Sequence, residues 1–484
     1  MATVANSLEH ELPVKDFAMT INGNRVVTDR YEVAINPATE QPIANFPAAD
    51  RSHLELAVSA AKAAFPAWRD APASVRQEAV AKLADLIEEN IEGFLTLLTT
   101  EQGKPRAGAE WEIGGSIYWL REIAKQSLPE EVVRDDSNSR VVTRYTPIGV
   151  IGAITPWNFP ILLAIWKIAP ALVAGNTLVL KPSPYTPLCT LWFGELAQKV
   201  LPPGVLNILS GGNDLGQWMT EHPGIGKISF TGSTATGKKV MQSGAINLKR
   251  LTLELGGNDA AIVLPDVDPK AIAKDLFWAC FQNSAQFCVA AKRLYVHEEI
   301  YDSLVSALVE YAKSVKVGNG ILPTSQLGPL QNKMQFDKVC NLLEDSVSQG
   351  HKVLLGGVPV DKPGYFIPVT LIDNPPDDSR CVVEEAFGPV LPILKYRDVD
   401  DAIRRANDTV YGLAASVWGG DIRKAKEVAQ RIEAGTVWIN QAHIFGPDIA
   451  FGGHKQSGVG IENSLHGLAE YCDMQTIMEK PLQR

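Results

Sequence analysis

Segments of helical periodicity occupy the first quarter of the chain. From 48 to 125, apolar residues recur at spacings of three and four, as in Val80, Leu83, Leu86 and Ile87. This spacing places the apolar side chains on one face of each helix. The pattern therefore predicts a layer of amphipathic helices before the first strand of the main sheet.

Beyond residue 148, short aliphatic or β-branched stretches alternate with helical segments, in two successive series that divide near Cys288. Strands separated by helices of this length indicate βαβ units and mainly parallel, doubly wound sheets. We therefore predict an α/β fold with two Rossmann-like domains. The predicted strands are 148–154, 177–180, 227–230, 250–255 and 260–264, then 293–296, 352–355, 390–396, 413–418 and 436–440.

Two further segments predict strands outside these series. Residues 130–144 carry β-branched stretches on both sides of Asp-Asp-Ser-Asn-Ser, and 471–478 have a similar strand pattern. Turn residues between charged, β-branched segments are typical of a hairpin with exposed strands. We expect this hairpin to project from the molecule as a small β arm.

Composition narrows the partners and the compartment. The net charge of −10 disfavours nucleic acid or an anionic membrane as the main partner. The longest uncharged stretch, 145–166, contains Pro147, Pro156 and Pro160, which would leave backbone groups unsatisfied in lipid. The six cysteines show no C-x-x-C spacing, and the eight histidines show no ligand spacing. We expect a cytoplasmic protein without disulfides or a metal site.

Cys288 and Glu254 are candidate catalytic residues. An isolated cysteine is most often a small buried hydrophobic side chain, but Glu254 gives Cys288 a potential partner. Glu254 stands inside the apolar strand 250–255, directly before two glycines. A carboxylate there costs free energy unless it is paired or functional, and burial would raise its pKa towards the range of a general base. The alternative is a glutamate on the solvent face of the strand.

Two turns follow predicted strands. Asn158 stands in Thr-Pro-Trp-Asn-Phe-Pro, at the carboxyl end of 148–154, where its amide could donate to an oxyanion; it could also be only a turn residue. Residues 232–239 nearly match the phosphate loop G-x-x-x-x-G-K-[ST], but Lys239 replaces the hydroxyl that would hold Mg²⁺. The same turn could cradle a dinucleotide pyrophosphate, so both interpretations stay open.

Together, these segments resemble the NAD(P)⁺-dependent aldehyde dehydrogenase superfamily. The matching motifs follow the family's order from Thr155 to Gly458, and the spacing from Glu254 to Cys288 is also similar. The resemblance covers nearly the whole chain. Its motifs are TPWNFP, LKPSP, LPPGVLNI, FTGSTATG, LELGG, the Cys288 segment, EEAFGPV, YGLAASVW, GTVWIN and FGGHKQSG.

The resemblance implies a domain organisation. A dinucleotide-binding domain would comprise 1–127 and 147–256, and a catalytic domain 257–456. An oligomerisation arm would comprise 128–146 and 457–484. Exposed strand edges in such an arm pair with a second subunit, so the resemblance implies a homodimer or a homotetramer.

The resemblance also implies roles for single residues. Cys288 would attack the aldehyde carbon, and the Asn158 amide with the Cys288 backbone N–H would hold the oxyanion. Hydride transfer would leave a thioester, which water activated by Glu254 would hydrolyse to the acid. The cofactor would be NAD⁺ or NADP⁺. Its contacts would be Trp157, Lys181, Ser183, Gly232, Ser233, Leu255, Glu385 and Phe387.

Three positions depart from the family pattern. Ala285 stands where glycine is common, and alanine restricts a positive φ and loop movement. Pro184 stands where NAD⁺-preferring members often carry glutamate, so no carboxylate there repels a 2′-phosphate and NADP⁺ should be tolerated. Ile461 stands where arginine is common, a difference that no argument from the sequence explains.

The resemblance places an apolar substrate pocket beside Cys288. Trp166 stands where semialdehyde-specific members have arginine, so an anionic carboxylate would find no partner. We therefore predict uncharged aliphatic or aromatic aldehydes as substrates, although these side chains could also belong to the core. The pocket residues are Phe159, Leu163, Trp166, Phe287, Val289, Phe445 and Phe451.

Three alternatives remain at this point. Transfer of the thioester to coenzyme A is disfavoured because Glu254 would hydrolyse it. A P-loop-type nucleotide-hydrolysing enzyme would leave Cys288, Glu254 and Asn158 unexplained. A catalytically idle relative kept for binding is suggested only by Ala285.

Overall fold

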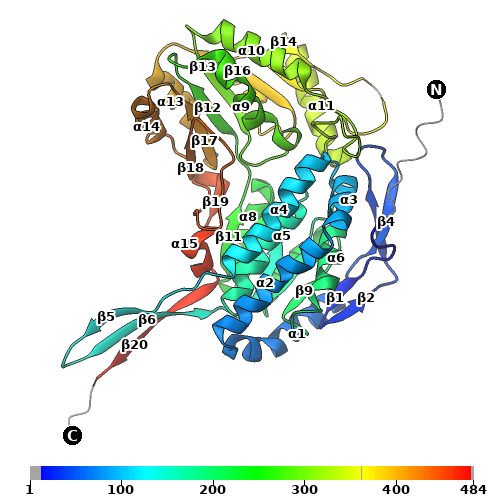
Figure 1. The fold of residues 1–484 in the computed structure, drawn as a ribbon, viewed down its shortest axis with the longest axis vertical. Coiled ribbons are helices and arrows are strands. Elements are labelled where there is room, and N and C mark those ends of the chain that lie inside the picture. The colour runs from blue at the N-terminus through cyan, green and yellow to red at the C-terminus, as the bar shows by residue number, and fades with distance from the viewer. Residues whose placement is uncertain (1–11, 361, 481–484) are drawn as a thin grey trace.

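A computed structural model describes residues 12–360 and 362–480. Two α/β units lie one above the other, and a β arm projects from the lower unit (Figure 1). Both units are built on mainly parallel sheets, as the alternating pattern predicts. The predicted α/β fold is confirmed.

The lower unit contains an eight-stranded sheet. Its five central strands are parallel, and the three outer ones run antiparallel to their neighbours. In spatial order the strands are β19 (Gly458–Val459), β11 (Arg250–Glu254), β10 (Lys227–Thr231), β7 (Val150–Ile154), β8 (Thr177–Lys181), β9 (Leu206–Ile208), β1 (Met19–Ile21) and β2 (Asn24–Val26).

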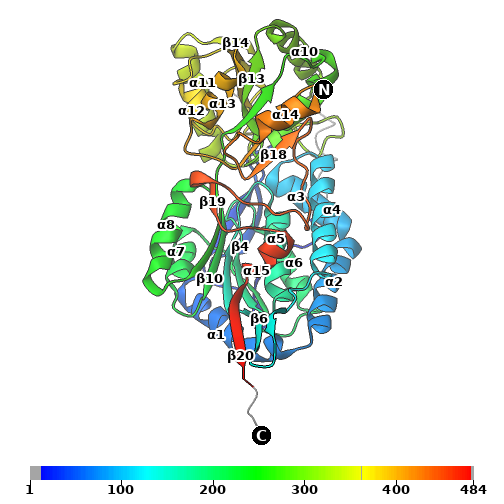
Figure 2. The same ribbon diagram turned by 90° about the vertical axis from the view of Figure 1, so that its left-hand side faces the viewer.

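Helices cover both faces of this sheet, which explains why its central strands read as continuous apolar stretches. Figure 2 shows α7 and α8 on one side and α2 and α4 on the other. The helices are α1 (Arg51–Asp70), α2 (Ala73–Glu89), α3 (Ile91–Gln102), α4 (Arg106–Ile123), α5 (Pro160–Val173), α6 (Leu188–Ala197), α7 (Asn213–Glu221) and α8 (Thr234–Gly244), followed by the 3-10 turn Ala245–Asn247.

The upper unit contains a seven-stranded sheet, in which only β14 runs antiparallel to its neighbour. The strands in spatial order are β14 (Lys352–Leu355), β15 (Thr370–Asp373), β16 (Val390–Tyr396), β13 (Ala291–His297), β12 (Asp259–Val263), β17 (Ala414–Trp418) and β18 (Thr436–Ile439). One face packs on α9 (Pro269–Phe281) and α10 (Tyr301–Ser314). The other packs on α11 (Lys333–Ser348), α12 (Arg380–Val383), α13 (Val399–Asn407) and α14 (Ile422–Ala429).

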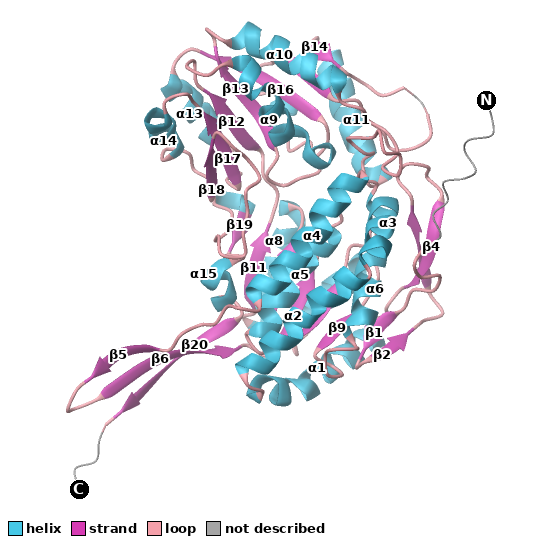
Figure 3. Cartoon of the chain, in the orientation of Figure 1, coloured by secondary structure: helices cyan, strands magenta, loops and turns pink. Residues whose placement is uncertain are grey.

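The arm is a three-stranded antiparallel sheet, β20 (Cys472–Glu479), β6 (Arg140–Pro147) and β5 (Glu131–Asp135). Figure 3 shows it as strands that extend away from the body. Of the segment 457–484 predicted for the arm, residues 472–479 form β20. Residues 458–459 pair with β11 of the lower sheet, and α15 (Ser464–Ala469) packs against both α5 and β20. Residues 481–484 lie outside the described residues.

The N-terminal strands are an addition to the prediction. Besides β1 and β2, the chain forms a separate hairpin of β3 (Tyr31–Ile35) and β4 (Pro42–Pro47). The hairpin is attached to both units. Ala49 N–H donates to the Ser210 carbonyl of the lower unit at 2.8 Å, and Tyr365 N–H donates to the Pro37 carbonyl at 2.9 Å. Among the described helices, none has the length and apolarity that a membrane crossing requires.

Candidate active site

The site lies at a topological switch point of the lower sheet. β7 and β10 are parallel neighbours, but the chain continues from β7 to β8 on one side and from β10 to β11 on the other. Such a reversal leaves a crevice at the carboxyl ends of the two strands. Asn158 follows β7, Ser233 follows β10, and Glu254 ends β11. The sequence motifs therefore meet at one edge of the sheet.

Cys288 reaches this edge from the upper unit, in the connection between α9 and β13. Its partly exposed side chain lines two cavities, one on each side. Burial raises the pKa of the Cys288 thiol to about 12, and the nearby Lys292 ammonium opposes the shift. Lys292 Nζ donates to the Cys288 carbonyl at 2.7 Å and lies 3.6 Å from Glu385 Oε1. The thiol is therefore neutral in the free protein at pH 7.

A left-handed turn precedes Cys288. Asn283, Ser284 and Ala285 have φ values of 54°, 56° and 58°. Non-glycine residues adopt this conformation at a cost of about 1–2 kcal/mol each, so the turn needs contacts that hold it. Ser284 Oγ donates to the Gly328 carbonyl at 2.8 Å, and Asn283 Nδ2 donates to the Asn158 carbonyl at 3.1 Å. Because these two neighbours hold the turn, Ala285 adopts a positive φ, a conformation that alanine disfavours.

The Asn158 side chain points towards the Cys288 loop. Its Nδ2 donates one hydrogen bond, to the Gln286 carbonyl at 3.1 Å, and an amide nitrogen carries a second N–H. The Asn158 carbonyl accepts from Lys104 Nζ at 2.9 Å, and Lys104 is itself paired with the buried Glu112. Glu112 also accepts from Ile161 N–H at the start of α5. This network holds a donor in place beside Cys288.

Glu254 is buried, with 4 % of its surface exposed. Neither carboxylate oxygen has a hydrogen-bond partner among the described residues. Burial raises the pKa of the carboxyl group well above its usual value, the negative charge of Glu462 raises it further, and Lys167 lowers it. Lys167 and Glu462 form a buried ion pair at 2.8 Å. A carboxyl group in this environment holds its proton more tightly than an exposed one and is a stronger base once ionised.

The larger of the two cavities is a cleft of about 1290 Å³ with both polar and apolar lining residues. It exceeds the roughly 300–1,000 Å³ of common small-molecule pockets, which suits an extended ligand. All eight residues predicted to contact a cofactor line it: Trp157, Lys181, Ser183, Gly232, Ser233, Leu255, Glu385 and Phe387. The cleft therefore joins residues that are up to 230 positions apart in the sequence.

Details of the cleft fit a dinucleotide. Ser233 caps the start of α8, where its Oγ accepts from Thr236 N–H at 3.3 Å. Ser233 and Thr236 line the cleft, so the N-terminus of α8, which favours phosphate groups, lies at the cleft wall. Glu385 Oε1 accepts from Gly257 N–H at 3.1 Å, and a Cβ at Gly256 would collide with the Glu385 carboxylate. The residues present therefore fit NAD⁺ or NADP⁺, with one polar end and one end beside Cys288.

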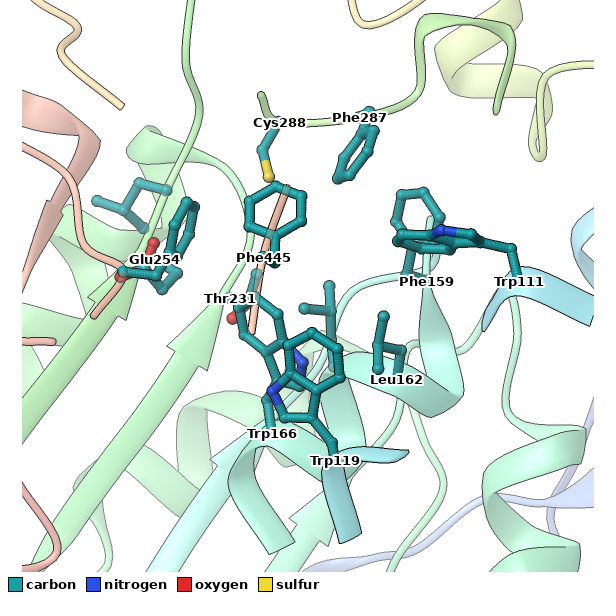
Figure 4. A pocket seen from close by; sticks show the side chains of 13 residues that line it. Trp111, Trp119, Phe159, Leu162, Trp166, Thr231, Glu254, Phe287, Cys288 and Phe445 are labelled. Atoms are coloured by element: carbon teal, nitrogen blue, oxygen red, sulfur yellow. The ribbon is translucent and has the colours of Figure 1, made fainter. Parts of the chain in front are cut away.

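The smaller cavity is an aromatic tunnel on the other side of Cys288 (Figure 4). Phe159 and Phe287 lie with ring centroids 4.6 Å apart, and Trp166 lies 5.7 Å from Phe451. Six of the seven predicted pocket residues line it, whereas Val289 is buried outside the lining. The thirteen lining residues, all within the described chain, include no Lys, Arg or His, and their one acidic side chain is that of Glu254.

Sequence reasoning missed several residues of this site. Trp111 and Trp119, both on α4, line the tunnel, as does Thr231. The helical pattern could show that α4 is amphipathic, but only tertiary packing shows that these rings face Cys288. Lys292 was missed as well, although a lysine inside the apolar strand β13 was a usable signal. Within 12–360 and 362–480, no group of three or more His, Cys, Asp or Glu is arranged to hold a metal ion.

Comparisons with known proteins agree with this geometry. Aldehyde dehydrogenase LUC3 of Fusarium sp is 41% identical over 95% of this chain and 98% of its own. The NAD⁺ complex of aldehyde dehydrogenase from Bacillus cereus superposes with a TM-score of 0.94 at 36% identity, covering 96% of each chain. A structure described as an E. coli NADP dependent enzyme gives 0.95 at 32% identity, covering 97% of this chain and 100% of that one.

A family model described as the aldehyde dehydrogenase family matches residues 27–477. This match leaves no basis for a P-loop nucleotide-hydrolysing enzyme, because the glycine turn at 232–239 belongs to the cleft that fits a dinucleotide. The chain therefore belongs to the aldehyde dehydrogenase family, whose members oxidise aldehydes with a nicotinamide cofactor.

Proposed function

We propose that this protein oxidises uncharged aliphatic or aromatic aldehydes to carboxylic acids, with NAD⁺ or NADP⁺ as the hydride acceptor. The supporting observation is the aromatic tunnel that ends at Cys288 and Glu254. An apolar aldehyde gains free energy by leaving water for this lining. A substrate with a carboxylate, such as a semialdehyde, would bury that charge without a cation and beside the acidic side chain of Glu254.

Cys288 is proposed as the nucleophile. Its thiol would first lose its proton to solvent, the thiolate sulfur would bond to the aldehyde carbon, and the carbonyl oxygen would become an oxyanion within reach of an amide donor. The N–H of Asn158 that is not bonded to Gln286 is such a donor. The nicotinamide cofactor supplies the hydride acceptor when it is bound in the cleft. Hydride loss from the carbon then leaves a thioester on Cys288.

Glu254 is proposed as the base for hydrolysis. Its carboxylate would take a proton from water, the hydroxide would add to the thioester carbon, and the C–S bond would break to release the acid and the Cys288 thiol. The raised pKa of Glu254 places its proton exchange closer to neutral pH, and its oxygens are not committed to another described residue. A hydrolytic base at this position disfavours transfer to coenzyme A.

Pro184 brings no carboxylate to the far end of the cleft, so we expect NADP⁺ to be accepted as well as NAD⁺. We also propose that the lower unit with α1–α8 binds the dinucleotide and that the upper unit supplies the nucleophile. The arm exposes Val132, Val133, Met474 and Met478, which supports a homodimer or homotetramer built through it. A monomer by light scattering would contradict that assembly.

The test is an aldehyde panel with product identification. Hexanal and benzaldehyde should each yield the acid and NADH or NADPH, with coenzyme A present and unacylated, and kcat/KM for succinate semialdehyde should be lower. Cys288→Ala should remove turnover while NADH binding remains. A higher kcat/KM for succinate semialdehyde would overturn the substrate class, and turnover by Cys288→Ala would overturn the nucleophile. Absence of oxidation with every aldehyde would favour the catalytically idle alternative.

A further inference from the structure

The cleft has two acidic residues among its lining residues, and only one of them is among the cofactor contacts that the sequence predicts. Glu385 lies beside Gly256 and the Cys288 loop. The other is Glu32 of β3, which lines a different part of the cleft together with Lys181 and Gly212. No sequence motif pointed to Glu32, because it belongs to the hairpin β3–β4, more than 140 residues before Lys181.

The position of Glu32 follows from the attachment of its hairpin. The hydrogen bond from Ala49 N–H to the Ser210 carbonyl fixes the end of β4 directly before the loop that enters α7. As a result, Glu32 Oε1 lies 3.6 Å from the point that a Cβ at Gly212 would occupy. The Glu32 carboxylate thus stands at the rim of the cleft, beside the start of α7.

Glu32 and Lys181 face the same part of the cleft. Burial lowers the pKa of the Lys181 amine to about 8, and the Glu32 carboxylate opposes this shift. Lys181 Nζ donates to the Pro182 carbonyl at 3.3 Å, which leaves further N–H groups for a ligand. The Glu32 carboxylate has no hydrogen bond or ion pair with the side chain or backbone of another described residue. A free acceptor therefore stands near a free donor.

This pair suits a ribose diol. Hydroxyl groups donate to a carboxylate and accept from an ammonium group, so adjacent 2′- and 3′-hydroxyls can satisfy both. A 2′-phosphate has no proton to give Glu32 at neutral pH and carries a charge of the same sign, which disfavours binding. Lys181, and Lys239 on α8, would attract that phosphate, so the carboxylate decides the balance.

We propose that Glu32 makes this enzyme prefer NAD⁺ over NADP⁺, in place of the carboxylate that is missing at Pro184. The inference rests on the proposed use of the cleft for a nicotinamide dinucleotide. It sharpens the expectation from Pro184 alone: NADP⁺ is accepted, but more weakly than NAD⁺. The acidic group that discriminates at this end comes from the N-terminal hairpin.

The test measures binding without aldehyde, by fluorescence titration of the full-length protein with NADH and with NADPH. The wild-type protein should bind NADH more tightly. Glu32→Gln should weaken NADH and strengthen NADPH, changing the ratio of the two dissociation constants by about tenfold or more, the effect expected for one charged hydrogen bond. Asp29→Asn, which removes an exposed carboxylate just before β3, is the matched control and should leave the ratio unchanged.

A reciprocal variant provides a second measurement. Adding Pro184→Glu to Glu32→Gln should restore discrimination against NADPH, because a carboxylate returns to the same part of the cleft. Glu32→Ser, at a position only partly buried, repeats the loss of charge with a smaller side chain if Glu32→Gln does not fold.

The outcomes separate two levels of failure. If the wild-type protein binds NADPH as tightly as NADH or more tightly, the role of Glu32 is overturned. The same holds if the ratio of the NADPH and NADH dissociation constants in both Glu32 variants stays within about twofold of the ratio in the Asp29→Asn control. If the same preparation still oxidises aldehydes, the proposed function holds even though the inference about Glu32 is wrong. Binding of neither dinucleotide would overturn both the nucleotide role of the cleft and the inference about Glu32.

Discussion

The tunnel and the cleft share Cys288 but differ in almost everything that lines them. The tunnel is narrow and built from aromatic rings, whereas the cleft is wide and carries lysines, carboxylates and the first amides of α8. The tunnel can reject charge because each buried charge there would lack a partner. The cleft can hold a charged ligand because its donors face inward. One sulfur can therefore meet an apolar and a charged reactant at the same time.

The largest expected effect comes from replacing the one acidic side chain of the tunnel. Glu254→Gln should lower kcat for benzaldehyde about 10²–10⁴-fold, the usual contribution of a general base, while the first turnover still releases NADH as a burst. Rapid-quench kinetics with mass detection of the acylated Cys288 would check it. Glu110→Gln, which neutralises an exposed carboxylate on α4, should behave as wild type. Steady turnover by Glu254→Gln near the wild-type rate would refute the assigned base.

A second experiment measures how strongly the burial of Cys288 between the two cavities disfavours ionisation of its thiol. Because burial raises the thiol pKa to about 12, the reactive thiolate is scarce at pH 7 and increases as pH rises. The rate of alkylation by neutral iodoacetamide should rise about tenfold per pH unit up to pH 10, whereas an ordinary thiol of pKa about 8.5 levels off. Peptide mass spectrometry would follow it, beside a cysteine model peptide. A plateau by pH 9 would show that the free enzyme does not suppress the thiolate.

The smallest expected effect concerns the tunnel lining. Trp111 is 40% exposed, and its ring lies 5.6 Å from that of Phe159 and 6.3 Å from that of Phe287. Trp111→Ala should lower kcat/KM for benzaldehyde about three- to tenfold, the value of one aromatic contact, and leave acetaldehyde within about twofold. Tyr118→Ala, which removes an exposed ring of the same helix outside the tunnel lining, is the control. An equal loss for both aldehydes would mean that Trp111 supports the fold rather than the substrate.

Much of the architecture could be predicted because apolar strands such as β7, β8 and β12 have few alternatives. β1–β4 could not, because they are short, and Tyr31, Asn24 and Arg25 are exposed, so no alternation stands out. Their place depends on contacts with distant residues such as Ser210 and Tyr365. The pairing of β19 with β11 is likewise a long-range contact, which the local pattern of residues 457–459 does not reveal.

The site, like the fold, contains residues that could be predicted from the sequence and residues that could not. The motifs that follow strand ends, at Asn158, Ser233 and Glu254, share one sheet edge, so their meeting could be inferred from topology. Glu32 and Trp111 reach the cavities through packing of a hairpin and a helix, and their local sequence carries no sign of it. The positive φ of Ala285 also runs against its local preference and is imposed by surrounding contacts.

The left-handed turn before Cys288 connects the Cys288 loop to both units at once. Gln331 N–H donates to Gln286 Oε1 at 2.8 Å, and Gln331 Nε2 donates to the carbonyls of Glu101 at 3.1 Å and Tyr185 at 2.8 Å, both in the lower unit. The strain of the turn is therefore balanced by contacts that exist only when the units are joined. The upper unit cannot be treated as a portable module, because excision would remove the contacts that set where its own thiol points.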